Sequence, residues 1–144
     1  MTGDYSYVYF ALEGDNFNPD EVTKRLGVLP TKIRRKGEPV GNNGMKNKFS
    51  AWYLHTEKTD NLFVKNLVKD VVERLFDKID IINGLKKDFH LTSILETVLL
   101  IDENEEVSTP VIGQDLNTIE FLFRTSTKTD VDIYRFNSLP AKPG

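Results

Sequence analysis

The sequence predicts an α+β protein, with helices on one face of a mainly antiparallel sheet. Residues 5–13 and 49–56 are rich in aromatic and β-branched side chains with a two-residue alternation, which is typical of strands. Residues 93–102 form a dense aliphatic run, as in a buried strand, and residues 62–82 repeat apolar side chains at helical spacing. The expected order is β-α-β-β-α-β-α-β. Its first six elements match a ferredoxin-like β-α-β-β-α-β sandwich, with an additional C-terminal helix and strand.

The first predicted strand, residues 5–13, has apolar or aromatic side chains on both of its faces. Tyr5, Tyr7 and Tyr9 share one face, because side chains alternate along a strand. A strand with two such faces is expected in the centre of its sheet.

A short helix is predicted over residues 18–27 from the residues at its ends. Asn18 can accept hydrogen bonds from the first turn, and Pro19 suits the first helical position. Gly27 suits the left-handed residue that ends a helix.

The next two strands are expected to be joined by a long loop. Residues 31–36 predict a short strand with Ile33 facing the core, and residues 49–56 predict an aromatic strand. The intervening segment is rich in Gly, Asn and Pro, which are typical of loops.

The longest helix is predicted over residues 62–82, where apolar residues recur every four positions. These are Phe63, Leu67, Val71, Leu75 and Ile79. Asn83 and Gly84 are expected to stop or bend this helix, and residues 85–89 to add a further turn.

The C-terminal part predicts three further elements. Residues 93–102 predict a strand, 114–124 a helix, and 130–136 a last strand with Val131 and Ile133 facing the core. No internal repeat or change of composition divides the chain, so a single domain over 1–144 is expected, with an ordered core over about 5–136.

Composition excludes several classes of function. The 144 residues include no cysteine, so disulfides, thiolate nucleophiles and zinc sites with Cys ligands are excluded. The longest aliphatic run, residues 98–101, is too short to cross a membrane. The first ten residues show no pattern of a signal peptide, so we expect a cytoplasmic protein with no membrane partner. The oligomeric state is left open.

Four segments in this order carry a resemblance to a known family. They are NPDEVTKRLGVLPT at 18–31, RKGE at 35–38, SAWYL at 50–54 and DVDIY at 130–134. With the strand before them, they make the chain similar, over about residues 5–136, to the mainly bacterial family called domain of unknown function 4279. The resemblance implies a compact α+β domain and no particular activity. It does not extend to the loop at 42–48.

The sequence gives little support for catalysis. His55 and His90 lie in separate predicted elements without the spacing of a metal site. Asp130 and Asp132 alternate on one strand face, about 7 Å apart, as paired catalytic carboxylates could. A terminal strand with one solvated face explains the same pattern, and we favour that reading. We therefore expect no catalytic residue, no metal site and no cofactor.

Charge is unevenly distributed along the chain. Residues 24–48 hold eight basic residues and one acid, Glu38, although the whole chain carries a net charge of −3. This asymmetry favours a non-catalytic module that binds a protein partner with an acidic surface, as immunity proteins do. The residues expected to contact the partner are Arg34, Arg35, Lys36, Lys46 and Lys48 in the basic loop, with Trp52 and Tyr53 as aromatic anchors.

Two alternatives stay open at this stage. The basic loop and the tyrosine face could bind single-stranded nucleic acid by stacking bases, although the sequence motif of the common RNA-binding sheet is absent. The consecutive cations Arg34, Arg35 and Lys36 could instead be compensated by the protein's own acids, for example those at 102–106. Their role would then be purely structural.

Overall fold

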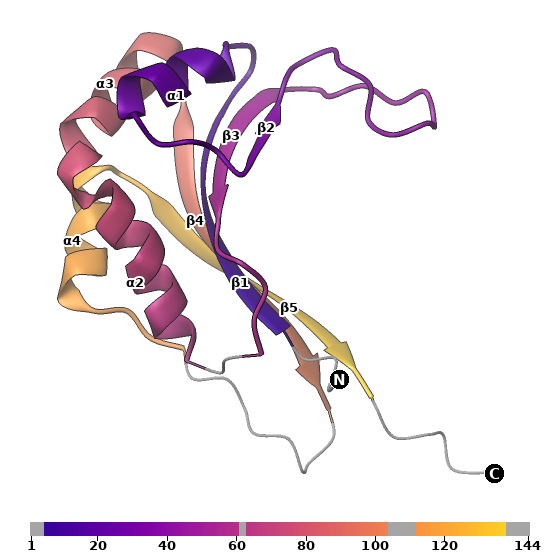
Figure 1. Ribbon diagram of the computed structural model, residues 1–144, viewed down its shortest axis with the longest axis vertical. Helices are drawn as coiled ribbons and strands as arrows, with labels where there is room; N and C mark the ends of the chain where they lie inside the picture. The colour runs from indigo at the N-terminus through magenta and orange to yellow at the C-terminus, as the bar shows by residue number, and fades with distance from the viewer. Residues whose placement is uncertain (1–4, 61–62, 104–111, 138–144) are drawn as a thin grey trace.

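A computed structural model describes residues 5–60, 63–103 and 112–137 of the chain (Figure 1). Its centre is a five-stranded sheet in the order β2-β3-β1-β4-β5. The strands are β1 Tyr5–Gly14, β2 Lys32–Arg34, β3 Ser50–His55, β4 Thr92–Asp102 and β5 Lys128–Phe136.

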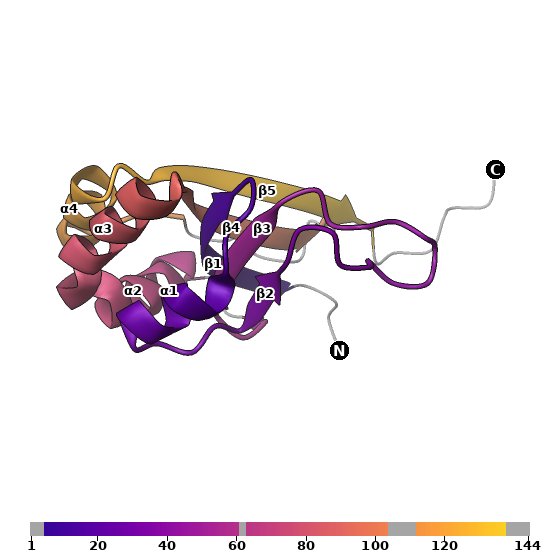
Figure 2. The ribbon, with the colours of Figure 1, turned by 90° about the horizontal axis from the view of Figure 1, so that it is seen from above.

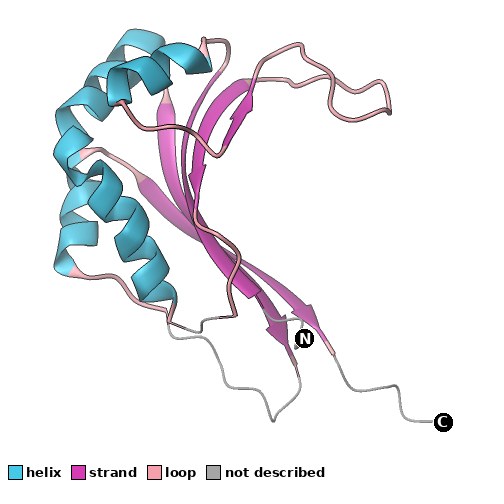
Figure 3. Cartoon of the chain, viewed as in Figure 1, coloured by secondary structure: helices cyan, strands magenta, loops and turns pink. Residues whose placement is uncertain are grey.

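The helices lie together on one face of this sheet (Figures 1 and 3). They are α1 Pro19–Leu26, α2 Val64–Leu75, the 3₁₀ turn η1 Phe76–Lys78, α3 Ile79–Phe89 and α4 Leu116–Arg124. No helix within the described ranges is long and apolar enough to cross a bilayer. The segment between β2 and β3 extends away from the helices (Figure 2).

Strand pairing confirms the α+β class and the mainly antiparallel sheet. β1 is antiparallel to both β3 and β4, and β2 is antiparallel to β3. Only the pair β4–β5 is parallel among the strands described. The central position predicted for the first strand is therefore confirmed, whereas the assignment to the ferredoxin-like group stays a prediction.

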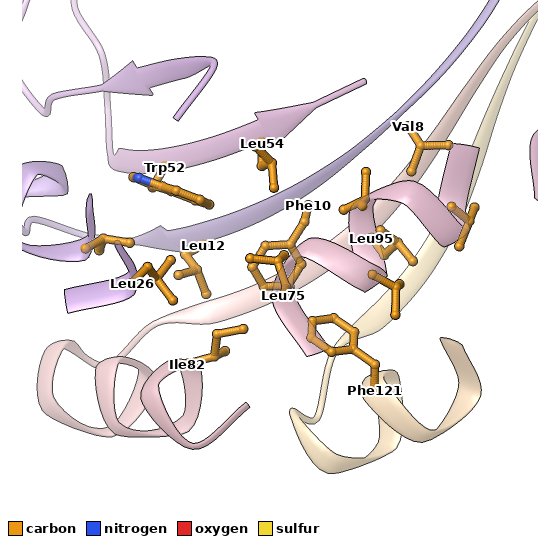
Figure 4. Packing of buried hydrophobic residues seen from close by; sticks show 14 of the residues in the cluster. Val8, Phe10, Leu12, Leu26, Trp52, Leu54, Leu75, Ile82, Leu95 and Phe121 are labelled. Carbon is orange, nitrogen blue, oxygen red and sulfur yellow. The ribbon is translucent and has the colours of Figure 1, made fainter. Parts of the chain in front are cut away.

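The core forms between the helices and the even-numbered side chains of β1. Val8, Phe10 and Leu12 have no exposed surface, and Leu75 and Phe121 cover them from the helical side (Figure 4). Burying a side chain of this size contributes roughly 1.5–3 kcal/mol. The two-residue period that buries these side chains turns the tyrosines of β1 to the other face.

The predicted ends of the first helix are confirmed. Asn18 lies outside the helix and its side chain accepts a hydrogen bond from the Asp20 backbone N–H. Gly27 ends the helix with φ of 69°, a left-handed conformation that glycine adopts without strain.

The long helix differs from its prediction. It is interrupted at η1, and Asn83 and Gly84 lie inside α3 without stopping it. The reason is packing: the Asn83 side chain donates to the Arg124 carbonyl, and a Cβ atom on Gly84 would lie 3.2 Å from the Arg25 guanidinium. Phe63, predicted in the apolar stripe, is instead exposed just before α2.

The last strand is also less buried than predicted. Val131 and Ile133 lie in register with Thr97 and Leu99, on the side of the sheet that carries the helices. They nevertheless stay 38% and 46% exposed, because β5 is an edge strand that extends past the helices (Figure 1). Both side chains therefore point to the side of the sheet that was predicted, but the burial expected for them was wrong.

Lys86 joins α3 to the turn that follows α4. Its ammonium donates hydrogen bonds to the Ser93 hydroxyl at 2.9 Å and to the carbonyls of Thr125 and Ser126 at 2.6 and 3.1 Å. Burial lowers the pKa of Lys86. The turn leads directly into β5, so Lys86 helps to fix where that strand begins.

Substitution of Lys86 tests whether its hydrogen bonds stabilise this connection between α3 and the turn after α4. Lys86→Met keeps much of the apolar stem but leaves partly buried acceptors without a donor, so the free energy of unfolding should fall by about 2–3 kcal/mol. Urea denaturation followed by circular dichroism measures it. Lys87→Met, at an exposed neighbouring position, should change it by less than about 0.5 kcal/mol. Equal effects of the two substitutions would contradict the role given to Lys86.

Candidate functional site

The sheet face opposite the helices is the candidate site, and we call it the open face. No described helix covers it (Figures 2 and 3). The strand registers place these charged and aromatic side chains on it, among others: Lys32, Arg34, Tyr53, His55, Tyr5, Tyr7, Tyr9, Glu13, Glu96, Lys128, Asp130 and Asp132.

A row of aromatic rings runs along the middle of the open face. The rings of Tyr5 and Tyr7 stack at 6.2 Å between centroids, and those of Tyr7 and Tyr9 at 6.4 Å. The ring of His55, from the neighbouring strand β3, lies 4.8 Å from that of Tyr9. Burial, with Lys32 nearby, lowers the pKa of His55, which favours a neutral ring against these aromatics.

Cations lie over aromatic rings on the side of the open face formed by β2 and β3. Lys32 lies 5.6 Å from the Tyr53 ring centroid, and Arg34 lies 5.2 Å from that of Phe49. Lys58, just after β3, lies 4.7 Å from the Tyr5 ring. Each such contact contributes about 0.5–1 kcal/mol at an exposed site.

Carboxylates gather on the opposite side of the open face. Glu96 on β4 pairs with Asp130 on β5, and oxygens of these residues and of Asp132 lie within 4.8 Å of one another. Glu96 is only 3% exposed, whereas both aspartates are exposed. Burial, followed by a hydrogen bond with Asp132, raises the pKa of Glu96 to about 7.

The sequence pattern indicates Asp130 and Asp132 as a pair but gives no indication that Glu96 belongs with them. The available signal was a single acid in the middle of the aliphatic run at 93–102. Sequence could not show that the last strand pairs in parallel with β4, which is what brings Asp130 beside Glu96.

Two of the three consecutive cations are compensated by the protein's own acids. Arg35 forms an ion pair with Asp20 at 2.8 Å, and Lys36 forms one with Asp15 at 3.0 Å. Glu38 also lies 3.8 Å from Arg35. The acids suggested from sequence, those at 102–106, mostly lie outside the described residues, so the compensation observed comes from the start of α1 and its neighbourhood.

The remaining predicted contact residues divide into exposed and buried groups. Lys46 and Lys48 are exposed, and their side chains have no ion pair within the described part of the chain. Trp52 has no exposed surface, and its indole N–H donates to the Thr23 hydroxyl of α1. Tyr53 is 7% exposed. Trp52 therefore offers no surface to a partner, and Tyr53 offers little.

A hollow of about 480 Å³ lies at the edge of the sheet, between α2 and the segment that follows β3. His55 and Lys58 line it together with Asp70 and Arg74 of α2. Its lining carries both signs of charge, so it selects no single class of charged small molecule.

Comparison with known proteins assigns the chain to a family. The family described as "Domain of unknown function (DUF4279)" matches residues 4–136, so the chain belongs to it and the resemblance seen in the sequence is confirmed. No curated protein and no solved structure matches the chain. The description of the family names no activity.

The raised pKa of Glu96 predicts a pH-dependent stability. The folded chain keeps a proton on Glu96 that the unfolded chain releases between about pH 4.5 and 7, so the free energy of unfolding falls as the pH rises through this window. Each pH unit of pKa difference corresponds to about 1.4 kcal/mol.

Glu96→Gln should abolish the part of the fall in unfolding free energy that Glu96 causes, because glutamine does not titrate. Both proteins are measured in buffer with a chelator. Between about pH 5 and pH 8, the free energy of unfolding of the wild type should fall by about 1–3 kcal/mol more than that of the variant. Urea denaturation at several pH values measures it. Parallel pH curves for the two proteins would refute the raised pKa.

The ion pairs of Arg35 and Lys36 predict that these cations are structural. Arg35→Glu should lower the free energy of unfolding by about 1 kcal/mol, because it replaces an attraction to Asp20 and Glu38 with repulsion. Lys48→Glu is the matched control and should leave it unchanged. A thermal melt of each variant measures the effect on stability. An unchanged melting temperature for Arg35→Glu would show that the ion pairs of Arg35 do not stabilise the fold.

Proposed function

We propose that the protein is a non-catalytic binding module that recognises a protein partner through the cationic half of its open face. This half consists of Lys32, Arg34 and Lys58 with the tyrosines of β1 and His55. The observation that carries the proposal is the division of the uncovered aromatic face into a cationic half and an acidic half.

Arg34 is the central contact in this proposal. It is half-buried against the rings of Phe49 and Tyr53, and within the described residues it has no ion pair. Its position is therefore fixed while its charge stays available. Arginine next to aromatic rings is the combination that most often dominates the energy of protein interfaces.

Lys46 and Lys48 lie in the loop between β2 and β3 and extend the positive charge into it. They are exposed, so they suit the rim of an interface, where charge mainly speeds the encounter. Arg35, Lys36 and Trp52 leave the proposed contact set, because the first two are paired internally and the third is buried.

The acidic half favours a protein over nucleic acid as the partner. Asp130 and Asp132 lie across the sheet from Lys32 and Arg34, on the other side of the tyrosine row. A single strand of nucleic acid that followed the tyrosines would bring its phosphates toward these carboxylates. A protein with a confined acidic patch can contact the cationic half alone. The cysteine-free composition fits a module of the reducing cytoplasm.

Charge reversal at Arg34 tests the proposal. Tagged wild-type protein and Arg34→Glu are used to capture partners from a lysate of the source organism, with and without nuclease, at low and high salt. A protein retained by the wild type after nuclease should bind Arg34→Glu at least tenfold more weakly.

Arg124→Glu is the control, because it reverses a charge on α4, on the covered side of the sheet. This variant should capture the partner as the wild type does. Equal capture by Arg34→Glu would refute the proposed contact. Recovery of nucleic acid that is lost steeply as salt rises would favour the alternative instead.

A further inference from the structure

The acidic half of the open face has no role in the proposed recognition, yet its geometry is specific. Glu96, Asp130 and Asp132 come from the two adjacent parallel strands β4 and β5, and their oxygens lie within 4.8 Å of one another. Two oxygens bound on opposite sides of one calcium ion, each about 2.4 Å from it, are separated by about that distance. The three side chains can therefore reach a single ion.

Glu96 distinguishes this group from an ordinary cluster of surface acids. Glu96 is only 3% exposed. Its carboxyl group shares a hydrogen bond with Asp132, but its Oε1 atom has no hydrogen-bond partner in the part of the chain that the structure describes. A buried carboxylate oxygen without a partner loses its hydration and gains nothing in return. An ion held between Glu96 and the two aspartates would supply that missing partner.

We propose that Glu96, Asp130 and Asp132 form a site for a hard divalent cation, with Ca²⁺ preferred because Mg²⁺ demands near-ideal octahedral geometry and gives up its water reluctantly. The ligands are all carboxylate oxygens, which this class of ion prefers. Asp130 and Asp132 are exposed, so water can complete the coordination. This site is independent of the proposed protein partner, because it uses none of the cationic residues.

The residues next to the site determine the affinity for the cation that we expect. Asp130 Oδ1 accepts a hydrogen bond from the Val131 N–H, which leaves Oδ2 for the ion. Lys128 lies close enough to Glu96 to act on its charge, and it opposes a cation. With three carboxylates and one opposing ammonium, we expect a dissociation constant of about 10⁻⁴–10⁻³ M, the range of weak calcium sites.

Metal titration of the whole chain tests the site directly. Protein stripped with a chelator is titrated at pH 7.5 with CaCl₂ and MgCl₂ by calorimetry, and with Tb³⁺, whose luminescence nearby tyrosines can excite. The expected result is one saturable site, bound more tightly by Ca²⁺ than by Mg²⁺, with Tb³⁺ emission displaced by Ca²⁺.

Substitutions assign the ligands. Asp132→Asn, at an exposed position, should keep the fold and weaken Ca²⁺ binding at least tenfold, and Glu96→Gln should do the same if its circular dichroism matches the wild type. Glu73→Gln and Asp80→Asn change exposed acids on the helices and should leave binding unchanged. No saturable binding by the wild type, or equal affinity in Asp132→Asn and the wild type, would overturn the proposal.

Discussion

The two-residue period of β1 is the constraint on which the rest of the structure depends. Val8, Phe10 and Leu12 on one face are fully buried under the helices, and this burial fixes the register of the central strand. A shift by one residue would bring Tyr7 and Tyr9 into the core. The same constraint therefore decides which side chains are left on the open face, and it links the stability of the fold to the chemistry of the candidate site.

The open face is organised by which strand lies on each side of β1. The hairpin of β2 and β3 brings Lys32 and Arg34 to one side, and the parallel pair of β4 and β5 brings carboxylates to the other. The row of tyrosines thus separates most of the charges of opposite sign, with Lys128 on β5 and Glu13 on β1 as exceptions. The proposed protein partner and the proposed cation would use different halves of this face.

Much of the fold could be predicted from sequence because local signals agree with it. Asn18 and Gly27 define the first helix, and the aromatic alternation defines β1 and β3. The errors arise where tertiary contacts override local preference. Gly84 continues its helix because Arg25 packs against it, and Ile133 is exposed because its strand extends past the helices. Glu96 gained its neighbours only through strand pairing, which sequence did not reveal.

The central claim is that the open face is the surface through which the protein meets its partner. A photoreactive amino acid placed at Tyr7, in the middle of this face, tests it in cells of the source organism, with Ile119 on the exposed side of α4 as the matched position. The account predicts a discrete protein adduct from position 7 and none from position 119. Adducts of equal yield from both positions, or an adduct from position 119 alone, would contradict it.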